Sequence, residues 1–102
     1  MQKIEYSIMA LEDLESIKEK ISLNNGNDTA LKMLRKIIKD IKVLEIFPFS
    51  GVNLGNLIDV STDYRYIFIE KNYVFYRVEN DKVKIIRIIN ERQDYIIQLF
   101  NN

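Results

Sequence analysis

The sequence contains no cysteine and no histidine, and each absence excludes a class of chemistry. Without cysteine the chain can form no disulfide, no thiolate metal ligand and no cysteine nucleophile. Without histidine it lacks the commonest general base and the commonest zinc ligand. Any catalysis must therefore use arginine, lysine, tyrosine or carboxylate side chains, and the sequence predicts no metal site and no cofactor.

Neither sign of charge is in excess, because 15 acidic side chains balance 15 basic ones. A neutral chain argues against strong, non-specific binding to nucleic acid, which usually accompanies a basic excess. The length of 102 residues and the hydrophobic content of 47% fit one domain spanning residues 1–102.

Long apolar runs are also absent. No stretch approaches the roughly 20 apolar residues that a membrane-spanning helix needs. The N-terminus lacks the long apolar segment of a secretory signal. We therefore expect a cytoplasmic protein without a membrane partner.

The apolar pattern predicts an α+β domain. Ser7 is a suitable N-cap for a first helix, and a second helix is expected from Asn27 or Asp28 to about Phe47–Pro48. Strands are expected at 2–6, 64–70, 73–78 and 83–89, with a short additional strand at 57–60 and a final helix at 94–100. This order predicts a two-helix hairpin packed on an antiparallel sheet of three to four strands.

Arginines on the expected strands carry the main chemical signal. Alternation along a strand places Arg77 on the side of Phe75, and Arg87 on the side of Ile85 and Ile89. Such arginines could bind a phosphate or an acidic partner. They could instead pair with strand glutamates, in which case their role is structural. The four candidates are Arg65, Arg77, Arg87 and, just after the last strand, Arg92.

Two further features could contact a ligand. Residues 32–42 carry five cations and one anion, and Lys36 and Lys39 are candidates for contact with a nucleic-acid backbone. A solvated amphipathic helix has the same pattern. Tyr95 follows Arg92 by three residues and is the tyrosine best placed to join an arginine site, but we favour its other role, packing of the last helix on the sheet.

The order of several short motifs resembles the RelE/ParE superfamily of toxins from bacterial type II toxin–antitoxin modules. The similarity extends over essentially the whole chain. The motifs are Tyr-Ser-Ile-Met-Ala-Leu-Glu-Asp-Leu at 6–14, Ile-Phe-Pro at 46–48 followed by Gly51, Tyr-Arg-Tyr at 64–66, Val-Phe-Tyr-Arg-Val at 74–78, and Arg-Ile-Ile-Asn-Glu-Arg-Gln-Asp-Tyr at 87–95.

The resemblance implies a small sheet with two N-terminal helices, an antitoxin protein as partner, and growth inhibition by the free toxin. RelE-like members cleave mRNA in the ribosomal A site without metal, with cationic side chains stabilising the transition state. In that role Arg65 and Arg92 match family arginines, and Tyr95 approximates a C-terminal tyrosine. The binding candidates, which follow from the residues and do not depend on this activity, are Arg77, Arg87, Lys36 and Lys39.

ParE-like members instead poison DNA gyrase, and two features favour this target. The segment Asn-Glu-Arg-Gln-Asp at 90–94 is similar to the ParE-like C-terminal signature, and the loop 47–64 has none of the lysines of RelE-like nucleases. We therefore favour a gyrase poison, with a ribosome-dependent ribonuclease second. An inactive antitoxin-binding module and a plain structural interaction domain remain further alternatives.

Overall fold

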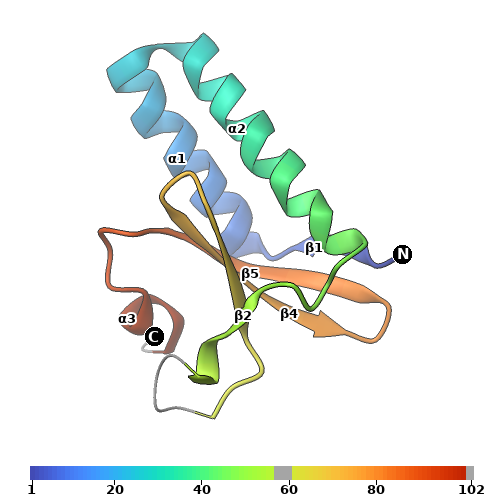
Figure 1. The fold of residues 1–102 in the computed structure, drawn as a ribbon. Coiled ribbons are helices and arrows are strands. Elements are labelled where there is room, and N and C mark those ends of the chain that lie inside the picture. Colours follow the sequence, from blue (N-terminus) through green and yellow to red (C-terminus); the bar gives the residue numbers. More distant parts are fainter. Residues whose placement is uncertain (57–60, 101–102) are drawn as a thin grey trace.

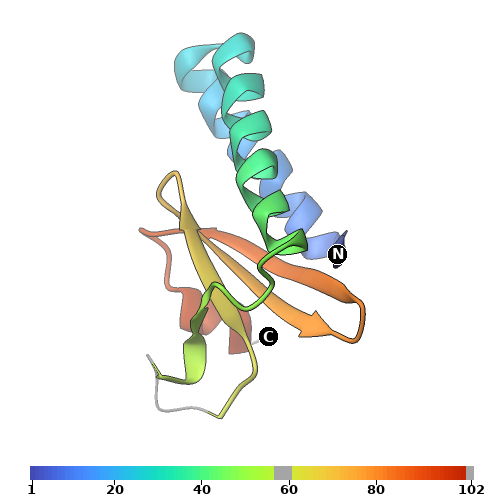
Figure 2. The same ribbon diagram turned by 45° about the vertical axis from the view of Figure 1, so that its right-hand side comes forward.

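A helical hairpin lies on one face of a five-stranded sheet in the computed structural model, which describes residues 1–56 and 61–100 (Figure 1). A short C-terminal helix lies on the other side of the sheet (Figures 1 and 2). The elements are β1 (Lys3–Tyr6), α1 (Ile8–Asn25), α2 (Asn27–Ile41), the 3₁₀ helix η1 (Lys42–Glu45), β2 (Val52–Asn53), the 3₁₀ helix η2 (Leu54–Asn56), β3 (Arg65–Ile69), β4 (Asn72–Glu79), β5 (Lys82–Asn90) and α3 (Tyr95–Phe100).

Ser7 starts α1 and also fastens it to the sheet. Its Oγ accepts a hydrogen bond from the Ala10 backbone N–H at 3.0 Å, which confirms the predicted N-cap. The same hydroxyl donates to the Ile86 carbonyl of β5 at 2.7 Å, and the Ser7 backbone N–H donates to Ile85 O at 2.9 Å. The junction between β1 and α1 is therefore fixed at three points.

Replacing Ser7 with alanine is expected to lower the free energy of unfolding by about 1 to 2 kcal/mol, because both side-chain hydrogen bonds are lost. Urea unfolding followed by circular dichroism measures the change. Ser22→Ala, in the last turns of the same helix, serves as the control and should shift stability by less than about 0.5 kcal/mol. Equal effects of the two substitutions would contradict the capping role.

The apolar stripe of the second helix packs on the sheet as predicted. Ile37 and Ile41 of α2 and Leu44 of η1 are fully buried. Regular α-helix ends at Ile41, earlier than predicted, and the chain continues as η1 to Glu45. The 3₁₀ helix η1 continues the apolar stripe of α2 and adds one buried residue, Leu44, to the core.

The sheet has the strand order β1-β5-β4-β3-β2. The three long strands β3, β4 and β5 are antiparallel neighbours, as predicted. Two short strands extend the sheet at its edges: β1 pairs with β5 in parallel, and β2 pairs with β3. Along the sequence, the helical hairpin separates β1 from the other strands. The local sequence therefore does not specify whether β1 runs parallel or antiparallel to β5. The strand expected at 57–60 lies outside the described residues.

An irregularity in β5 changes which residues share a face. Tyr76 is opposite Ile85, but the preceding Phe75 is opposite Arg87, so Ile86 is an extra residue in β5. Arg87 therefore does not share a face with Ile85, and that part of the sequence prediction was wrong. Simple alternation fails here because the bulge adds one residue to β5. Residues after Ile86 therefore lie on the opposite face, relative to Ile85, from the one that alternation predicts.

Two apolar clusters occupy the two faces of the sheet. The face toward the hairpin packs Val74, Tyr76 and Ile85 against residues of α1 and α2. The opposite face packs Phe75 and Ile89 against Leu54 and against α3, which contributes Tyr95 and Leu99. Within the described ranges no helix has the length and apolar character needed to cross a membrane.

Candidate functional site

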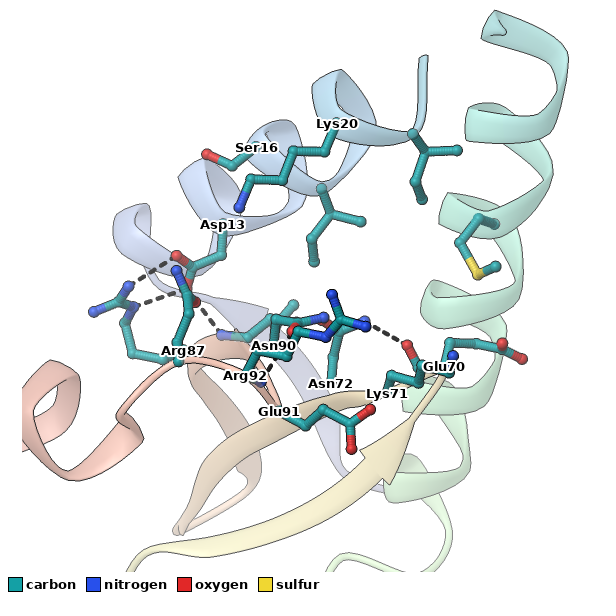
Figure 3. A pocket seen from close by; sticks show the side chains of 15 residues that line it. Asp13, Ser16, Lys20, Glu70, Lys71, Asn72, Arg87, Asn90, Glu91 and Arg92 are labelled. Carbon is teal, nitrogen blue, oxygen red and sulfur yellow. Dashed lines mark hydrogen bonds and ion pairs between the residues drawn. The ribbon is translucent and has the colours of Figure 1, made fainter. Parts of the chain in front are cut away.

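An almost buried ion pair joins α1 to β5. The Asp13 carboxylate accepts from Arg87 Nε at 2.7 Å and from Arg87 Nη2 at 2.9 Å, and the two side chains are only 14% and 12% exposed (Figure 3). The same carboxylate also accepts the Ile88 backbone N–H at 2.9 Å. The pairing of β1 with β5 ends at Ile85, so no backbone carbonyl of β1 reaches the Ile88 N–H. The Asp13 carboxylate accepts this hydrogen bond instead.

Arg87 is therefore occupied by contacts within the protein. The hydrogen bond from Asp13 raises the pKa of the Arg87 guanidinium above its ordinary value. Its Nη1 also donates to the Gln98 carbonyl of α3 at 3.3 Å. The sequence named Arg87 as a binding residue with strand glutamates as possible partners, whereas the structure pairs it with a helix aspartate.

Arg65 is held by the loop that precedes β2. Its Nη1 donates to Gly51 O at 3.0 Å and to Phe49 O at 3.4 Å, and its guanidinium lies 5.1 Å from the centre of the Phe49 ring. No carboxylate of the described residues forms an ion pair with it. Arg65 thus closes the loop 46–51 onto β3.

The remaining strand arginine, Arg77, pairs with Glu79 two residues along the same face of β4. Arg77 Nε donates to Glu79 Oε2 at 3.0 Å. This hydrogen bond raises the pKa of Arg77 and lowers the pKa of the Glu79 carboxyl. Pairing with a strand glutamate is the structural alternative that the sequence had left open for this arginine.

The two lysines predicted on the second helix differ in their contacts. Lys36 Nζ donates to Asp40 at 2.9 Å and lies 3.6 Å from Glu70 in the turn between β3 and β4. Lys39 is exposed, and no described carboxylate forms an ion pair with it. Only Lys39 therefore presents an uncommitted charge.

Tyr95 begins α3 and packs on the aromatic face of the sheet. Its ring centre lies 5.1 Å from that of Tyr73 and 5.4 Å from that of Phe75. Burial raises the pKa of the Tyr95 phenol above its ordinary value, so the phenol stays protonated near neutral pH and is not a ready base. The sequence left two roles for Tyr95, a place in an arginine site and packing of the last helix on the sheet. Its ring contacts fit the packing role.

Arg92 lies in the segment between β5 and α3 and is exposed. It lines a pocket of about 660 Å³ bounded by α1, α2, the β3–β4 turn and the end of β5 (Figure 3). Arg65 instead lines a smaller hollow with Phe49 and Asp63. The structure thus does not bring Arg65, Arg92 and Tyr95 together in one pocket.

The pocket also contains residues that the sequence did not single out as site residues. Asp13 could have been noticed because it directly precedes a buried position of α1, Leu14, and so lies at the border of the apolar stripe. Lys20, Lys71 and Asn72 had no such signal, because their proximity arises only when the β3–β4 turn folds beside α1. Among the described residues, no three acidic side chains are placed to hold a metal ion.

Two solved structures share this architecture. One is described as the chromosomal ParDE TA system from P. aeruginosa; it matches with a TM-score of 0.76 at 23% identity, over 88% of this chain and 96% of that chain. The other, the YoeB–YefM complex from Staphylococcus aureus, matches with a TM-score of 0.54 at 23% identity, over 87% of this chain and 95% of that chain. No curated protein sequence matches at a significant level.

These matches establish the fold class of toxins found in toxin–antitoxin complexes. The sequence itself is more specific, because residues 4–95 match the family described as ParE toxin of type II toxin-antitoxin system, parDE. The chain belongs to this family. It is the toxin component of a type II toxin–antitoxin system.

Proposed function

We propose that this toxin arrests growth by poisoning DNA gyrase and that it has no nuclease activity of its own. Its membership of the ParE toxin family supports this target. The ParE-like segment Asn-Glu-Arg-Gln-Asp at 90–94 supports it as well. Gyrase is an enzyme of the bacterial cytoplasm, so the proposal places the toxin there.

The surroundings of Arg65 carry this proposal. A metal-free ribonuclease needs cationic donors aimed at the reacting phosphate, in a site where other donors and a proton acceptor converge. Arg65 donates instead to Phe49 O and Gly51 O. Both hydrogen bonds use Nη1 of Arg65 and fix the direction of its guanidinium, while Arg87 is paired with Asp13 and would have to leave that partner to bind a phosphate.

One observation favours the ribosome-dependent ribonuclease as the second candidate. Arg92 is exposed and lines the large pocket together with Lys20 and Lys71. Such a group of cations could stabilise the charge of a phosphate in the transition state. Arg92→Ala should then abolish mRNA cleavage, whereas Lys32→Ala, which removes a similarly exposed cation of α2 outside the pocket, should not.

Expression of the toxin without antitoxin tests the target directly. We expect growth arrest with induction of the SOS response and with DNA cleavage complexes that contain gyrase, while mRNA remains intact. Sequencing of mRNA 5′ ends and recovery of covalent gyrase–DNA complexes measure the two outcomes, and co-expression of the antitoxin is the control.

Cuts at fixed codon positions on stalled ribosomes, without gyrase complexes, would overturn the proposal and establish the ribonuclease. Unchanged growth would contradict both targets and favour an antitoxin-binding module without activity.

A further inference from the structure

The outer face of α2 carries a row of exposed cations, the basic stripe, that the proposed function does not use. Its members are Lys32, Arg35, Lys36, Lys39 and Lys42, the last of which begins η1. From the geometry of an α-helix, they lie within about 120° of the helix circumference and extend over about 15 Å. The stripe is opposite the buried Ile37 and Ile41. In both views α2 lies in front of α1, and no described element covers it (Figures 1 and 2).

The charges within the basic stripe repel one another. Residues three or four positions apart on a helix are neighbours, and like charges at this spacing destabilise the helix. Arg35 and Lys39 form such a pair, and so do Lys39 and Lys42. Within the described residues only Lys36 of the stripe forms ion pairs, with carboxylates of α2 and of the β3–β4 turn. A helix that only faces water could relieve this repulsion with glutamates, so the clustering indicates a surface for an anion.

The two helices of the hairpin differ in charge, although the chain as a whole is neutral. Residues 27–45 contain five cations and three acids, whereas residues 8–25 contain four acids and two lysines. The α2 side of the hairpin is therefore positive and the α1 side negative. A polyanion is attracted to the first side and repelled by the second, so the hairpin would approach it with α2 in front.

The chemistry of the basic stripe fits the backbone of a duplex. The stripe contributes no side chain to either hollow described above, so it is a convex helix face without a pocket. Lysine is depleted at the centre of protein–protein interfaces, whereas it contacts phosphates as a point charge. Residues 27–42 include no aromatic side chain on which single-stranded bases could stack. Phosphate contacts of this kind position a protein on DNA and carry no sequence information.

We propose that the basic stripe contacts the phosphate backbone of duplex DNA, namely the DNA that gyrase holds, without reading its sequence. The stripe would then orient the toxin on the complex of enzyme and DNA. The zero net charge of the chain fits a contact that acts within such a complex, because a toxin that bound DNA strongly by itself would be distributed over many non-specific sites. This inference rests on the proposed function for the origin of the DNA.

Fluorescence anisotropy of a short labelled DNA duplex, titrated with purified full-length toxin at several salt concentrations, tests the contact without gyrase. For the wild-type toxin we expect the logarithm of the association constant to fall with the logarithm of the salt concentration, with a slope of about −4.5. The triple variant Arg35→Gln/Lys39→Gln/Lys42→Gln loses three phosphate contacts. It should raise the Kd by about 10-fold or more at low salt and bring the slope to about −2.

A second triple variant, Lys3→Gln/Lys18→Gln/Lys84→Gln, removes the same charge outside the stripe and should change the Kd by less than about threefold. None of these lysines, and none of the three cations replaced in the stripe, forms an ion pair with a described carboxylate. Glutamine also has nearly the helix propensity of lysine and arginine, so both variants should retain the circular dichroism spectrum of the wild type.

Equal losses in the two variants, or no binding of the duplex at about 50 mM salt, would overturn the proposal. Tighter binding of a single-stranded RNA oligonucleotide than of the duplex, through the same three cations, would also overturn it and would identify RNA as the ligand.

A cleavage assay with purified gyrase and a supercoiled plasmid separates this inference from the gyrase target. The toxin concentration that gives half-maximal cleavage complexes should rise by about 10-fold in the stripe variant and stay unchanged in the control variant. Cleavage complexes formed equally well by the stripe variant and the wild type would overturn the inference and leave gyrase as the target. Duplex binding through the stripe, without cleavage complexes at any toxin concentration, would overturn the gyrase target and leave the DNA contact in place.

Discussion

Asp13→Ala is expected to destabilise the toxin by about 3 kcal/mol or more, the largest effect of any substitution considered. The substitution leaves the Arg87 guanidinium nearly buried without its counter-charge, and removal of one partner from a buried pair costs about 3 to 5 kcal/mol. It also leaves the Ile88 backbone N–H without its acceptor. Urea unfolding monitored by circular dichroism measures the loss.

The second partner supplies the control for this prediction. Arg87→Met removes the buried charge, so the double variant Asp13→Ala/Arg87→Met should recover part of the stability lost in Asp13→Ala alone. Glu12→Ala, an exposed neighbour on α1, should change stability by less than about 0.5 kcal/mol. If Asp13→Ala were no more damaging than Glu12→Ala, the ion pair would not be a structural link between α1 and β5.

Gly51→Ala is expected to destabilise the toxin by about 2 to 3 kcal/mol through overpacking. A Cβ at this position would lie 2.5 Å from Tyr76 Oη and 2.7 Å from the Tyr66 carbonyl oxygen. Tyr76 is fully buried, and its hydroxyl accepts the Gly51 N–H at 2.9 Å, so the ring cannot move away without breaking this bond. Thermal unfolding of the purified variant measures the effect.

Gly26→Ala separates steric crowding from backbone strain. Gly26 has a φ of 88°, but nothing lies within 4 Å of a Cβ added there. With ψ at 164° this backbone conformation is essentially restricted to glycine, so strain alone should cost about 1 to 3 kcal/mol at Gly26. A loss of less than about 1 kcal/mol at Gly51 would show that the loop 46–51 adapts and does not depend on its close contact with Tyr76.

The instability expected of both variants bears on how toxicity assays are interpreted. A destabilised toxin accumulates to lower levels, so loss of growth arrest in Asp13→Ala or Gly51→Ala would reflect abundance and not the target. Exposed substitutions such as Arg92→Ala avoid this problem. Substitution of Arg65 does not avoid it, because removal of this side chain also releases the loop that Arg65 holds against β3.

The sequence was sufficient to predict the family and the longer elements, but not β2, η1 or η2. The Ser7 cap, the stripe containing Ile37 and Ile41, and the strands with their turns all depend on residues close together in the chain. Short-range patterns of this kind report local hydrogen bonding and burial directly. The order of the short motifs also indicated the family from sequence alone, and the family match over residues 4–95 agrees with it.

The roles of the arginines could not be predicted in this way. Whether Arg87 is free or paired depends on Asp13, which is 74 residues away in the chain. The bulge at Ile86 also reversed the alternation from which its face had been inferred. The sequence made Arg65 a candidate catalytic residue, yet the loop containing Phe49 folds back and accepts hydrogen bonds from its Nη1.

By itself, then, the sequence determined that this is a neutral α+β toxin without histidine or cysteine, and that any chemistry must come from its arginines, lysines, tyrosines and acids. Only the tertiary structure decided which of those cations have partners among the described residues. Arg65 and Arg87 link separate segments of the chain and Arg77 pairs with Glu79 within β4, while Lys20, Lys71 and Arg92 line one pocket. The physical reason is that a charge is neutralised by whatever lies within a few ångströms of it, and that neighbourhood is set by the packing of distant segments.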